Sequence, residues 1–356
     1  MKRRVLVNAL AILSLVATTS PAFAQKINPT PQKPVTLKIS YNAVELMGSK
    51  IVQWEPEHGM ATIFKNMVEN ATDGAIKVEL YPNAQLGDNK ASYEMLKAGS
   101  IEAVIATGVI PIYFPEFELI SIPYLFKSPE IAWWVFDNSK FWRDFSERFR
   151  VKTGMRLLAM GQNGVRNFTH KDKFLKKPAD LKGEKIRVMQ SPIFVNMMNA
   201  FGANAVPIAW SELYSALQTG VVKGQENPIS VIIGGSIYEV QKYMTMDAHL
   251  WSEDSLIISD KFYNSLPKNF QNIIRQAAKV AETTNRGIET IHSMGPGLEL
   301  LKEKGMKVYV PTDAEKDAFA KVAQPAVQKY LEDKLGKPAV KGMFDAVAEA
   351  EKALGY

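Results

Sequence analysis

GQNGVRNFTH (161–170), DLKGEKIRV (180–188) and NAFGANAVPIAWSELYSALQTGVVKGQENP (199–228) belong to one stretch that decides the fold. Arg166 and Arg187 lie near the ends of short apolar runs, and Asn227 precedes a proline. Between them, SELYSALQTG has the spacing of an amphipathic helix that stops at Gly220. A guanidinium can bind both oxygens of a carboxylate, and an amide can donate a further bond. The stretch therefore predicts a site for a small carboxylate.

Composition places the chain among globular proteins and argues against nucleic acid as a partner. The 356 residues exceed the usual size of one domain, which favours two. The formal charge is +6, and removal of the basic residues at 2–4 leaves 40 basic against 37 acidic residues, a net charge of +3. That charge is mild and dispersed, whereas nucleic-acid binding needs clustered basic residues.

The first 24 residues have the pattern of a cleavable signal peptide. Basic residues at 2–4 precede an apolar run at 9–17, and the small residues Ala22 and Ala24 stand before the expected cleavage site. The chain contains no cysteine, which excludes disulfides and a lipid-modified N-terminal cysteine. We therefore expect a protein that is free in the periplasm. The alternative is tethering by an uncleaved signal.

The rest of the chain alternates strands and helices, which predicts the α/β class. Strands are expected at 35–40, 75–82 and 101–108, with helices at 60–72 and 90–99 between them. This order favours parallel pairing through right-handed crossovers. Further along we expect one aromatic-rich helix at 131–150, a strand at 155–160, the second alternating unit, a returning strand at 242–259, and a long helix from Pro267 that breaks at Gly295-Pro296-Gly297.

The predicted first domain comprises residues 33–160 and about 253–292. The second comprises residues 161–250 and about 293–356, so the chain crosses between them near 158–164 and 247–254. These two crossings are expected to act as a hinge.

Signatures of catalysis are scarce. The chain has no cysteine nucleophile and none of the common hydrolase, phosphate-loop, dinucleotide or zinc-protease motifs. Its four histidines, at 58, 170, 249 and 292, lack metal-ligand spacing, so we expect neither a metal nor a cofactor. The alternative is a periplasmic hydrolase or lyase in which Glu226, His249 or an unassigned carboxylate acts as the base or nucleophile. A third reading, a protein that signals by closing on its ligand, differs only in its partner.

A family resemblance rests on GQNGVR, DLKGEKIRV and the pattern Y-x-A-L-Q-T-G-V-V-x-G-Q-E-N-P at 214–228. The chain resembles the extracytoplasmic solute-binding proteins of TRAP transporters, the DctP-like family, over nearly its whole mature length. The resemblance implies a two-domain periplasmic-binding-protein-like fold. Each domain would be a mixed sheet flanked by helices, with the ligand cleft between the domains and a long brace helix. It further implies transport without catalysis and TRAP membrane permease subunits as partners. For the oligomeric state, a monomer is the default expectation.

The resemblance also assigns ligand contacts to particular residues. Arg187 would hold the ligand carboxylate, supported by Arg166 and Asn227, with Trp210 against the ligand body. The positions that line the pocket in sialic-acid-binding relatives correspond to Asn42, Thr107 and His249. Against ligand roles, Arg187 and Arg166 could form ordinary salt bridges, Asn227 could serve a turn, and Trp210 could belong to the core.

Two departures argue against sialic acid as the ligand. The loop at 43–58 is longer than in those relatives, and Thr107 replaces an acidic residue. Sugar acids, C4-dicarboxylates, keto acids and aromatic acids stay open. Trp210 and His249 favour a larger, hydroxylated or ring-bearing acid.

Overall fold

The computed structural model describes residues 34–47 and 53–356, so the predicted signal peptide lies outside the described residues. The strands are β1 (Val35–Ser40), β2 (Ile76–Tyr81), β3 (Ala103–Ala106), β4 (Met155–His170), β5 (Lys185–Val188), β6 (Asn204–Pro207), β7 (Gly224–Asn227), β8 (Tyr243–Ser259) and β9 (Lys307–Tyr309).

The helices alternate with these strands along most of the chain. They are α1 (Pro56–Ala71), α2 (Asn89–Ala98), α3 (Pro129–Asn138), α4 (Lys140–Thr153), α5 (Pro192–Ala200), α6 (Trp210–Thr219), α7 (Ile229–Gly234), α8 (Asp260–Ser265), α9 (Lys268–Ser293), α10 (Pro296–Glu303), α11 (Asp313–Leu335) and α12 (Lys337–Leu354). Short 3₁₀ turns join several of them.

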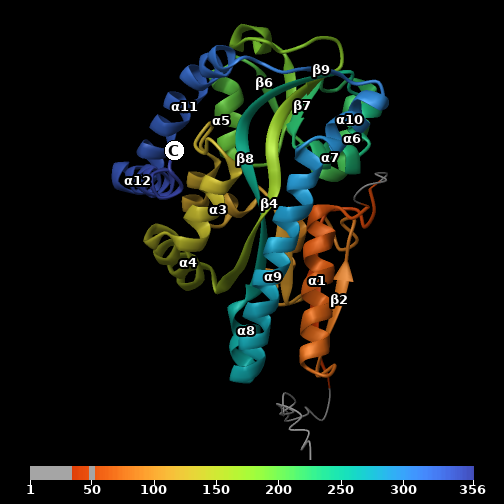
Figure 1. Ribbon diagram of the computed structural model, residues 1–356, viewed down its shortest axis with the longest axis vertical. Helices are drawn as coiled ribbons and strands as arrows, with labels where there is room; N and C mark the ends of the chain where they lie inside the picture. The colour runs from red at the N-terminus through yellow and green to blue at the C-terminus, as the bar shows by residue number, and fades with distance from the viewer. Residues whose placement is uncertain (1–33, 48–52) are drawn as a thin grey trace, which may run out of the picture. The chain divides into compact units, whose positions relative to one another are not determined.

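The strands form a mixed sheet in the order β2-β1-β3-β8-β4-β7-β5-β6, with β9 paired to β8. β1 is parallel to β2 and β3, and β5 is parallel to β6 and β7, as the alternating pattern predicts. The two long strands β4 and β8 are antiparallel and run through the middle of the sheet (Figure 1). β8 pairs with β3 and β4 pairs with β7, so the β4–β8 pair connects the β1–β3 part of the sheet to the β5–β7 part.

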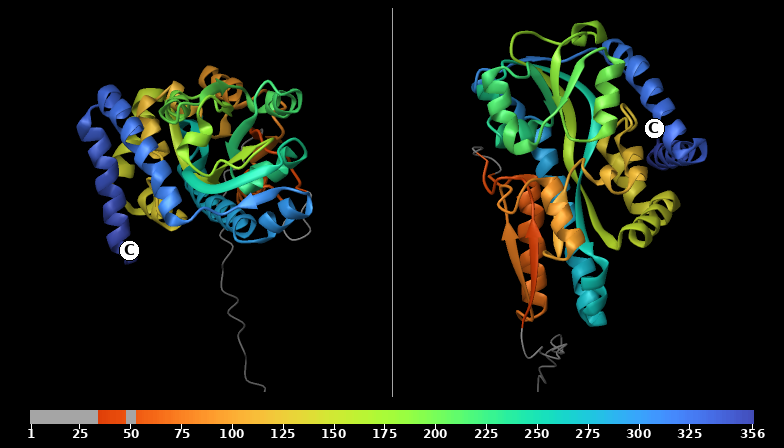
Figure 2. Two further views of the ribbon diagram at one scale, coloured as in Figure 1. Left: turned by 90° about the horizontal axis from the view of Figure 1, so that it is seen from above. Right: turned by 180° about the vertical axis from the view of Figure 1, so that it is seen from behind.

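Three clusters of buried apolar side chains surround this sheet. One lies under α1 and α9 beside β1–β3, and includes Leu37 and Phe64. A second packs α3, α4, α5, α11 and α12 against the other face, as the views from above and behind show (Figure 2). The third lies around α6, α7 and α10. The predicted domain limits fall inside β4, inside β8 and at the end of α9. The limits themselves stay a prediction.

Two helices differ from the sequence-based expectation. The aromatic segment expected as one helix is divided into α3 and α4, because Ser139 is extended and its hydroxyl accepts the Trp142 N–H at 3.1 Å. The helix expected from residue 60 begins at Pro56, because the Glu55 carboxylate accepts the N–H groups of Glu57 and His58. In both cases a side-chain cap decides where the helix starts.

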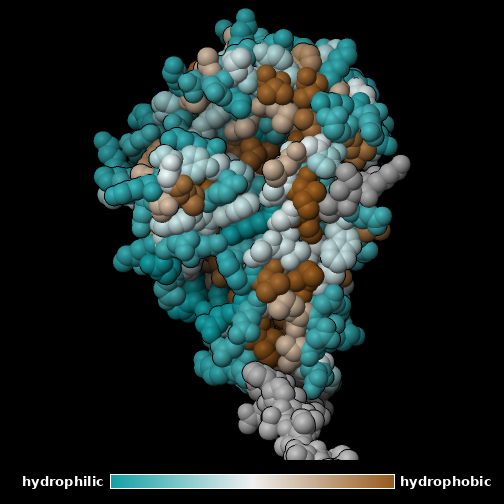
Figure 3. Space-filling model, in the orientation of Figure 1, coloured by the Kyte–Doolittle hydropathy of each residue, from teal (hydrophilic) through white to brown (hydrophobic). Residues whose placement is uncertain are grey.

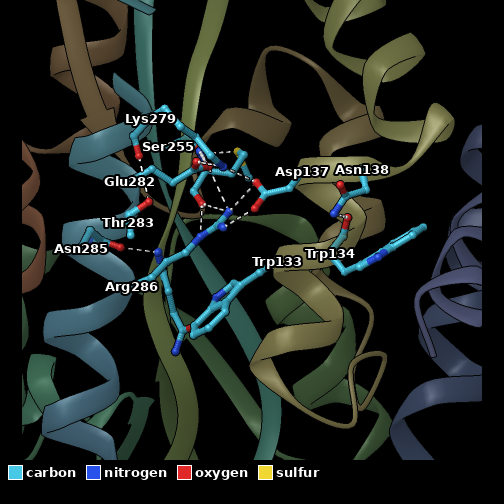
Figure 4. A network of polar contacts seen from close by, with 12 residues as sticks. Trp133, Trp134, Asp137, Asn138, Ser255, Lys279, Glu282, Thr283, Asn285 and Arg286 are labelled. Atoms are coloured by element: carbon cyan, nitrogen blue, oxygen red, sulfur yellow. Dashed lines mark hydrogen bonds and ion pairs between the residues drawn. The ribbon is translucent and has the colours of Figure 1, made fainter. Parts of the chain in front are cut away.

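The long helix α9 braces the centre of the molecule. Its Arg286 donates to Asp137 of α3 at 2.8 Å and to the backbone carbonyl of Met160 in β4 at 2.8 Å (Figure 4). Glu282 accepts the Met160 N–H at 2.8 Å. The helix ends at Ser293, and α10 resumes at Pro296, so the expected interruption at Gly295-Pro296-Gly297 is confirmed.

The outer side of α9 carries exposed apolar side chains. Val280 and Ile291 of α9, and Met294 directly after it, are exposed. The view of this face shows hydrophobic patches along its centre among hydrophilic residues (Figure 3). Within residues 34–47 and 53–356, no helix is both long and apolar enough to cross a membrane.

Candidate functional site

A cavity of about 390 Å³ lies where the ends of several strands meet the starts of several helices. Six of the seven site residues expected from the sequence line it: Asn42, Thr107, Arg166, Arg187, Trp210 and Asn227. They come from parts of the chain up to 185 positions apart, so the fold, and not their spacing, brings them together.

Arg187 supplies an uncompensated positive charge to this cavity. It lies on β5 and is only 2% exposed. Its Nε donates to the Ile208 carbonyl at 3.0 Å, which orients the guanidinium. The two terminal nitrogens form no hydrogen bond with any described residue. Burial lowers the pKa of Arg187 to about 10, so the group stays protonated at neutral pH. A buried charge of this kind needs an anion.

Arg166, in contrast, is neutralised by the protein. Its Nη2 donates to Glu226 Oε1 at 2.9 Å, and its Nε donates to the other oxygen of the same carboxylate. Both side chains are fully buried. Burial alone would raise the pKa of Glu226, but Arg166 and His249 lower it to about 2. Arg166 therefore forms the salt bridge that is the alternative to a ligand contact. It also lines the cavity.

His249 lies behind this ion pair and is not among the residues that line the cavity. Its Nε2 is 3.2 Å from Glu226, its Nδ1 is 2.9 Å from Asp247, and its ring stacks on Phe168. Burial opposes its charge, but the two carboxylates raise its pKa to about 9. His249 thus lies behind Glu226 and outside the cavity wall, and the expected ligand contact of this residue stays a prediction. The two cations and two anions of the network balance, which leaves Arg187 unpaired.

The orientation of Asn227 is set by a chain of side-chain hydrogen bonds. Thr169 donates to Gln241 at 3.0 Å, Gln225 donates to Thr169 at 2.8 Å, and Asn227 Nδ2 donates to Gln225 at 2.5 Å. Each donor fixes the acceptor of the next, so the amide nitrogen of Asn227 faces Gln225 and keeps one further proton. That proton is available for a ligand oxygen.

Trp210 opens α6 and forms part of the cavity wall. A methyl group in place of the hydrogen at Gly235 would lie 2.6 Å from the indole, so the glycine allows the ring to approach the backbone. The indole therefore has a fixed place beside the cavity. It is half-buried and lies partly against the cavity, not wholly within the core.

The cavity also contains residues that sequence reasoning missed. Glu55 and Glu57 from the start of α1 and Asn89 from the start of α2 contribute to its wall. The only local signal was the capping pattern before each helix, which predicts a helix start but no contact with a cavity. Burial, together with the nearby Asp254, raises the pKa values of both Glu55 and Glu57 well above the usual range.

The two residues named as candidates for a catalytic base are both engaged within the protein. Glu226 and His249 are bonded to each other and hold their charges firmly, so neither is a free base. Within the described part of the chain, no group of three His, Cys, Asp or Glu side chains could hold a metal ion.

Comparison with known proteins identifies the family of this chain. Residues 47–334 match the family described as bacterial extracellular solute-binding protein, family 7. A solute-binding protein of Verminephrobacter eiseniae is 33% identical over 284 residues, which cover 80% of this chain and 83% of the relative.

Two solved structures are similar in fold. DctPAm from Advenella mimigardefordensis, in complex with galactonate, has a TM-score of 0.82 and 30% identity, covering 89% of this chain and 99% of that chain. A TRAP periplasmic solute-binding protein from Shewanella oneidensis, with bound succinate, has a TM-score of 0.80 and 26% identity, covering 88% and 100%. The chain therefore belongs to family 7 of the bacterial extracellular solute-binding proteins, the DctP-like binding proteins of TRAP transporters, which are not enzymes.

Proposed function

We propose that this chain binds a small organic acid through the carboxylate, which Arg187 holds, and that a sugar acid is the first candidate. The observation that carries the proposal is the buried guanidinium of Arg187, which lines the cavity without a carboxylate partner among the described residues. The galactonate and succinate bound by the two similar proteins are both organic acids, which supports the class.

The energetics fit a transport protein that must release its solute. Each hydrogen bond to a charged group contributes about 1.5–3 kcal/mol. Bonds from Arg187 and Asn227, together with apolar contact at Trp210, are partly offset by the costs of association and ordering. A dissociation constant of roughly micromolar order, about −8 kcal/mol, is the expected balance.

The proposed cycle takes place in the periplasm after removal of the signal peptide at residues 1–24. The monomer closes on its ligand by bending where β4 and β8 cross between the two parts of the sheet, near residues 158–164 and 247–254. Hinge closure of this kind is typical of periplasmic binding proteins. The closed form then delivers the acid to TRAP membrane permease subunits.

The test is a comparison of Arg187 variants. A thermal-shift screen of organic acids first identifies a ligand, since a ligand at 100 times its dissociation constant stabilises the protein by about 2.7 kcal/mol. Titration calorimetry with that ligand should then show that Arg187→Ala loses about 2–5 kcal/mol of binding free energy. Arg187→Lys should also bind poorly, because one ammonium cannot replace the two-pronged contact.

Lys185→Ala is the matched control, because this lysine lies on the same strand and is exposed. It should bind like the wild type. Equal affinity of the wild type and both Arg187 variants would rule out the proposed role of this residue.

A further inference from the structure

The wall of the cavity formed by the first part of the chain includes several side-chain oxygens that can accept hydrogen bonds. We call the residues Glu55, Glu57, Asn89 and Thr107, which all line the cavity, the acceptor wall. The hydrogen bonds that these four side chains already make within the protein decide which of their atoms can contact a ligand.

Thr107 has used its one side-chain proton within the protein, and Asn89 has used one of the two on its amide nitrogen. The Thr107 hydroxyl donates to Asp254 at 2.8 Å, which leaves its oxygen lone pairs for other partners. The Asn89 amide nitrogen donates to the Thr107 carbonyl at 3.2 Å, which fixes the orientation of the amide. Asn89 Oδ1 is buried and receives no hydrogen bond from a described residue. Both side chains therefore present acceptors.

Glu57 adds a further acceptor of the same kind. Its Oε2 accepts the Ala43 N–H at 2.9 Å, whereas its Oε1 is buried and receives no hydrogen bond from any described residue. Glu55 lies two residues earlier, and its carboxylate caps α1. A buried acceptor without a donor is unfavourable, so these oxygens favour a ligand that carries donors.

The charges of the cavity favour a ligand with a single carboxylate. Arg187 is its one arginine or lysine without a carboxylate partner in the described part of the chain, since Arg166 is paired with Glu226. Lys90 lines a separate adjoining pocket of about 30 Å³, together with Asp88. An acid with two carboxylates would satisfy one on Arg187, while the other would face Glu55 and Glu57 without a cation of its own.

From this arrangement we infer that the ligand is a polyhydroxylated monocarboxylate, and that Glu57 and Asn89 select for hydroxyl groups and against a second carboxylate. The inference rests on the proposed function, because it requires the first carboxylate to lie on Arg187. A hydroxyl can donate to the acceptor wall, whereas an ionised carboxylate has only acceptors and would place a second negative charge beside two buried carboxyl groups that have no cation of their own. The inference therefore favours ligands like galactonate over ligands like succinate, each of which is bound by one of the similar proteins.

The experiment uses matched pairs of acids that differ only at the end remote from the first carboxylate. The pairs are galactonate with galactarate, gluconate with glucarate, and erythronate with tartrate, and hexanoate serves as an acid without hydroxyls. Calorimetry on the mature wild-type protein should show that the tightest-binding monoacid exceeds its diacid partner by about 100-fold or more. It should exceed hexanoate by a similar factor.

Two variants connect this preference to the acceptor wall. Glu57→Gln replaces a carboxyl that can ionise by an amide that cannot, and the amide always offers a donor, so it should narrow the ratio of monoacid to diacid affinity at least about tenfold. Glu45→Gln is the matched control, because Glu45 is an exposed carboxylate near the same loop and does not line the cavity. It should leave the ratio unchanged.

Asn89→Leu provides a second test in case Glu57→Gln does not fold. It should weaken monoacid binding about tenfold or more and leave hexanoate binding unchanged, because only the hydroxylated acid uses the amide oxygen. A diacid that binds within tenfold of its monoacid in the wild type overturns the inference. So does a ratio that neither variant changes.

Failure of the proposed function has a different signature. In that case neither the acids of the pairs nor hexanoate would bind, or Arg187→Ala would bind them as well as the wild type does. If the acids bind in an Arg187-dependent manner but without discrimination at the remote end, only the inference about the acceptor wall fails.

Discussion

At the scale of single residues, two arginines of the same cavity have opposite roles. Arg166 is fully buried against Glu226, and the network with His249 and Asp247 is neutral. Arg187 is just as buried but keeps two nitrogens without a partner among the described residues. A paired arginine contributes structure, whereas an unpaired one can bind an anion. The different neighbours, and not the residue type, therefore define the function of each.

A buried carboxyl on α9 makes stability depend on pH. Burial raises the pKa of Glu289 to about 8, with a further contribution from Asp254. The folded state thus favours the protonated form of Glu289. The contribution of this group to the free energy of unfolding is therefore fully present below its pKa in the unfolded chain, about 4.3, and is lost as the pH rises towards 8. Glu289→Gln removes this dependence. We expect the free energy of unfolding of the variant to rise relative to that of the wild type between pH 5 and pH 9.

Urea unfolding at both pH values measures the effect. A tenfold change in a proton-binding constant corresponds to about 1.4 kcal/mol. The relative increase in the unfolding free energy of Glu289→Gln from pH 5 to pH 9 should exceed this value. Glu349→Gln, at an exposed position on α12, is the control and should follow the wild type. A constant difference between Glu289→Gln and the wild type across this range would contradict the prediction.

At the scale of elements, the irregularities of the β4–β8 pair matter most. The register shifts between Leu157 and Ala159, between Gln162 and Gly164, and between Arg166 and Phe168. Gly164 has a φ of +132°, and a Cβ there would lie 2.4 Å from Glu289 and 2.5 Å from Pro228. This close approach brings β4, α7 and α9 together at the predicted crossing, so the backbone needs a residue without a side chain.

The glycine at this crossing should tolerate no side chain. Gly164→Ala combines an unfavourable φ with a steric clash, and should lower the free energy of unfolding by about 2–4 kcal/mol. Gly287→Ala is the matched control, because this glycine lies within α9 and a Cβ added there would meet nothing within 4 Å. It should stabilise the protein by about 0.5–1 kcal/mol, since alanine favours helix. Chemical unfolding of both variants measures the two changes in the free energy of unfolding. Equal changes would show that position 164 does not require a glycine.

At the scale of the whole described chain, α9 connects parts that are distant in the sequence. Arg286 joins α9 to Asp137 of α3 and to the backbone of β4, and it lies over the Trp133 ring (Figure 4). Asn285 also accepts the Gln162 N–H at 2.5 Å and donates to Asp254 at 3.0 Å. The helix thereby supports the crossing strands on which the cavity depends.

Loss of this support should affect global stability. Arg286→Ala leaves the buried Glu282 and Asp137, whose side chain is 29% exposed, without their arginine, and should lower the free energy of unfolding by about 3 kcal/mol. Lys279→Ala is the control, because its side chain is 56% exposed although it contacts the same two acids. It should change stability by about 0–1 kcal/mol. Equivalent losses in the two variants, measured by urea unfolding, would show that burial of Arg286 is unimportant.

Much of the architecture could be predicted from local patterns. Period-two alternation located β1 and β2, helical periodicity located α2 and most of α1, and the order of these elements predicted the parallel pairing of β1 with β2 and β3. The motif at 214–228 led to the family. These features depend on residues that are close in the chain, so the sequence is sufficient to reveal them.

The charge state of the site depended on tertiary structure alone. Arg166 and Glu226 are 60 positions apart, yet their contact turns a candidate ligand residue into a neutral pair. Glu55 and Glu57 enter the cavity only because α1 packs beside the end of β1. The sequence by itself determined which elements form and which family the chain resembles. The fold decided which charges are neutralised, because electrostatic partners are selected by proximity in space and by exclusion of water, neither of which is encoded locally.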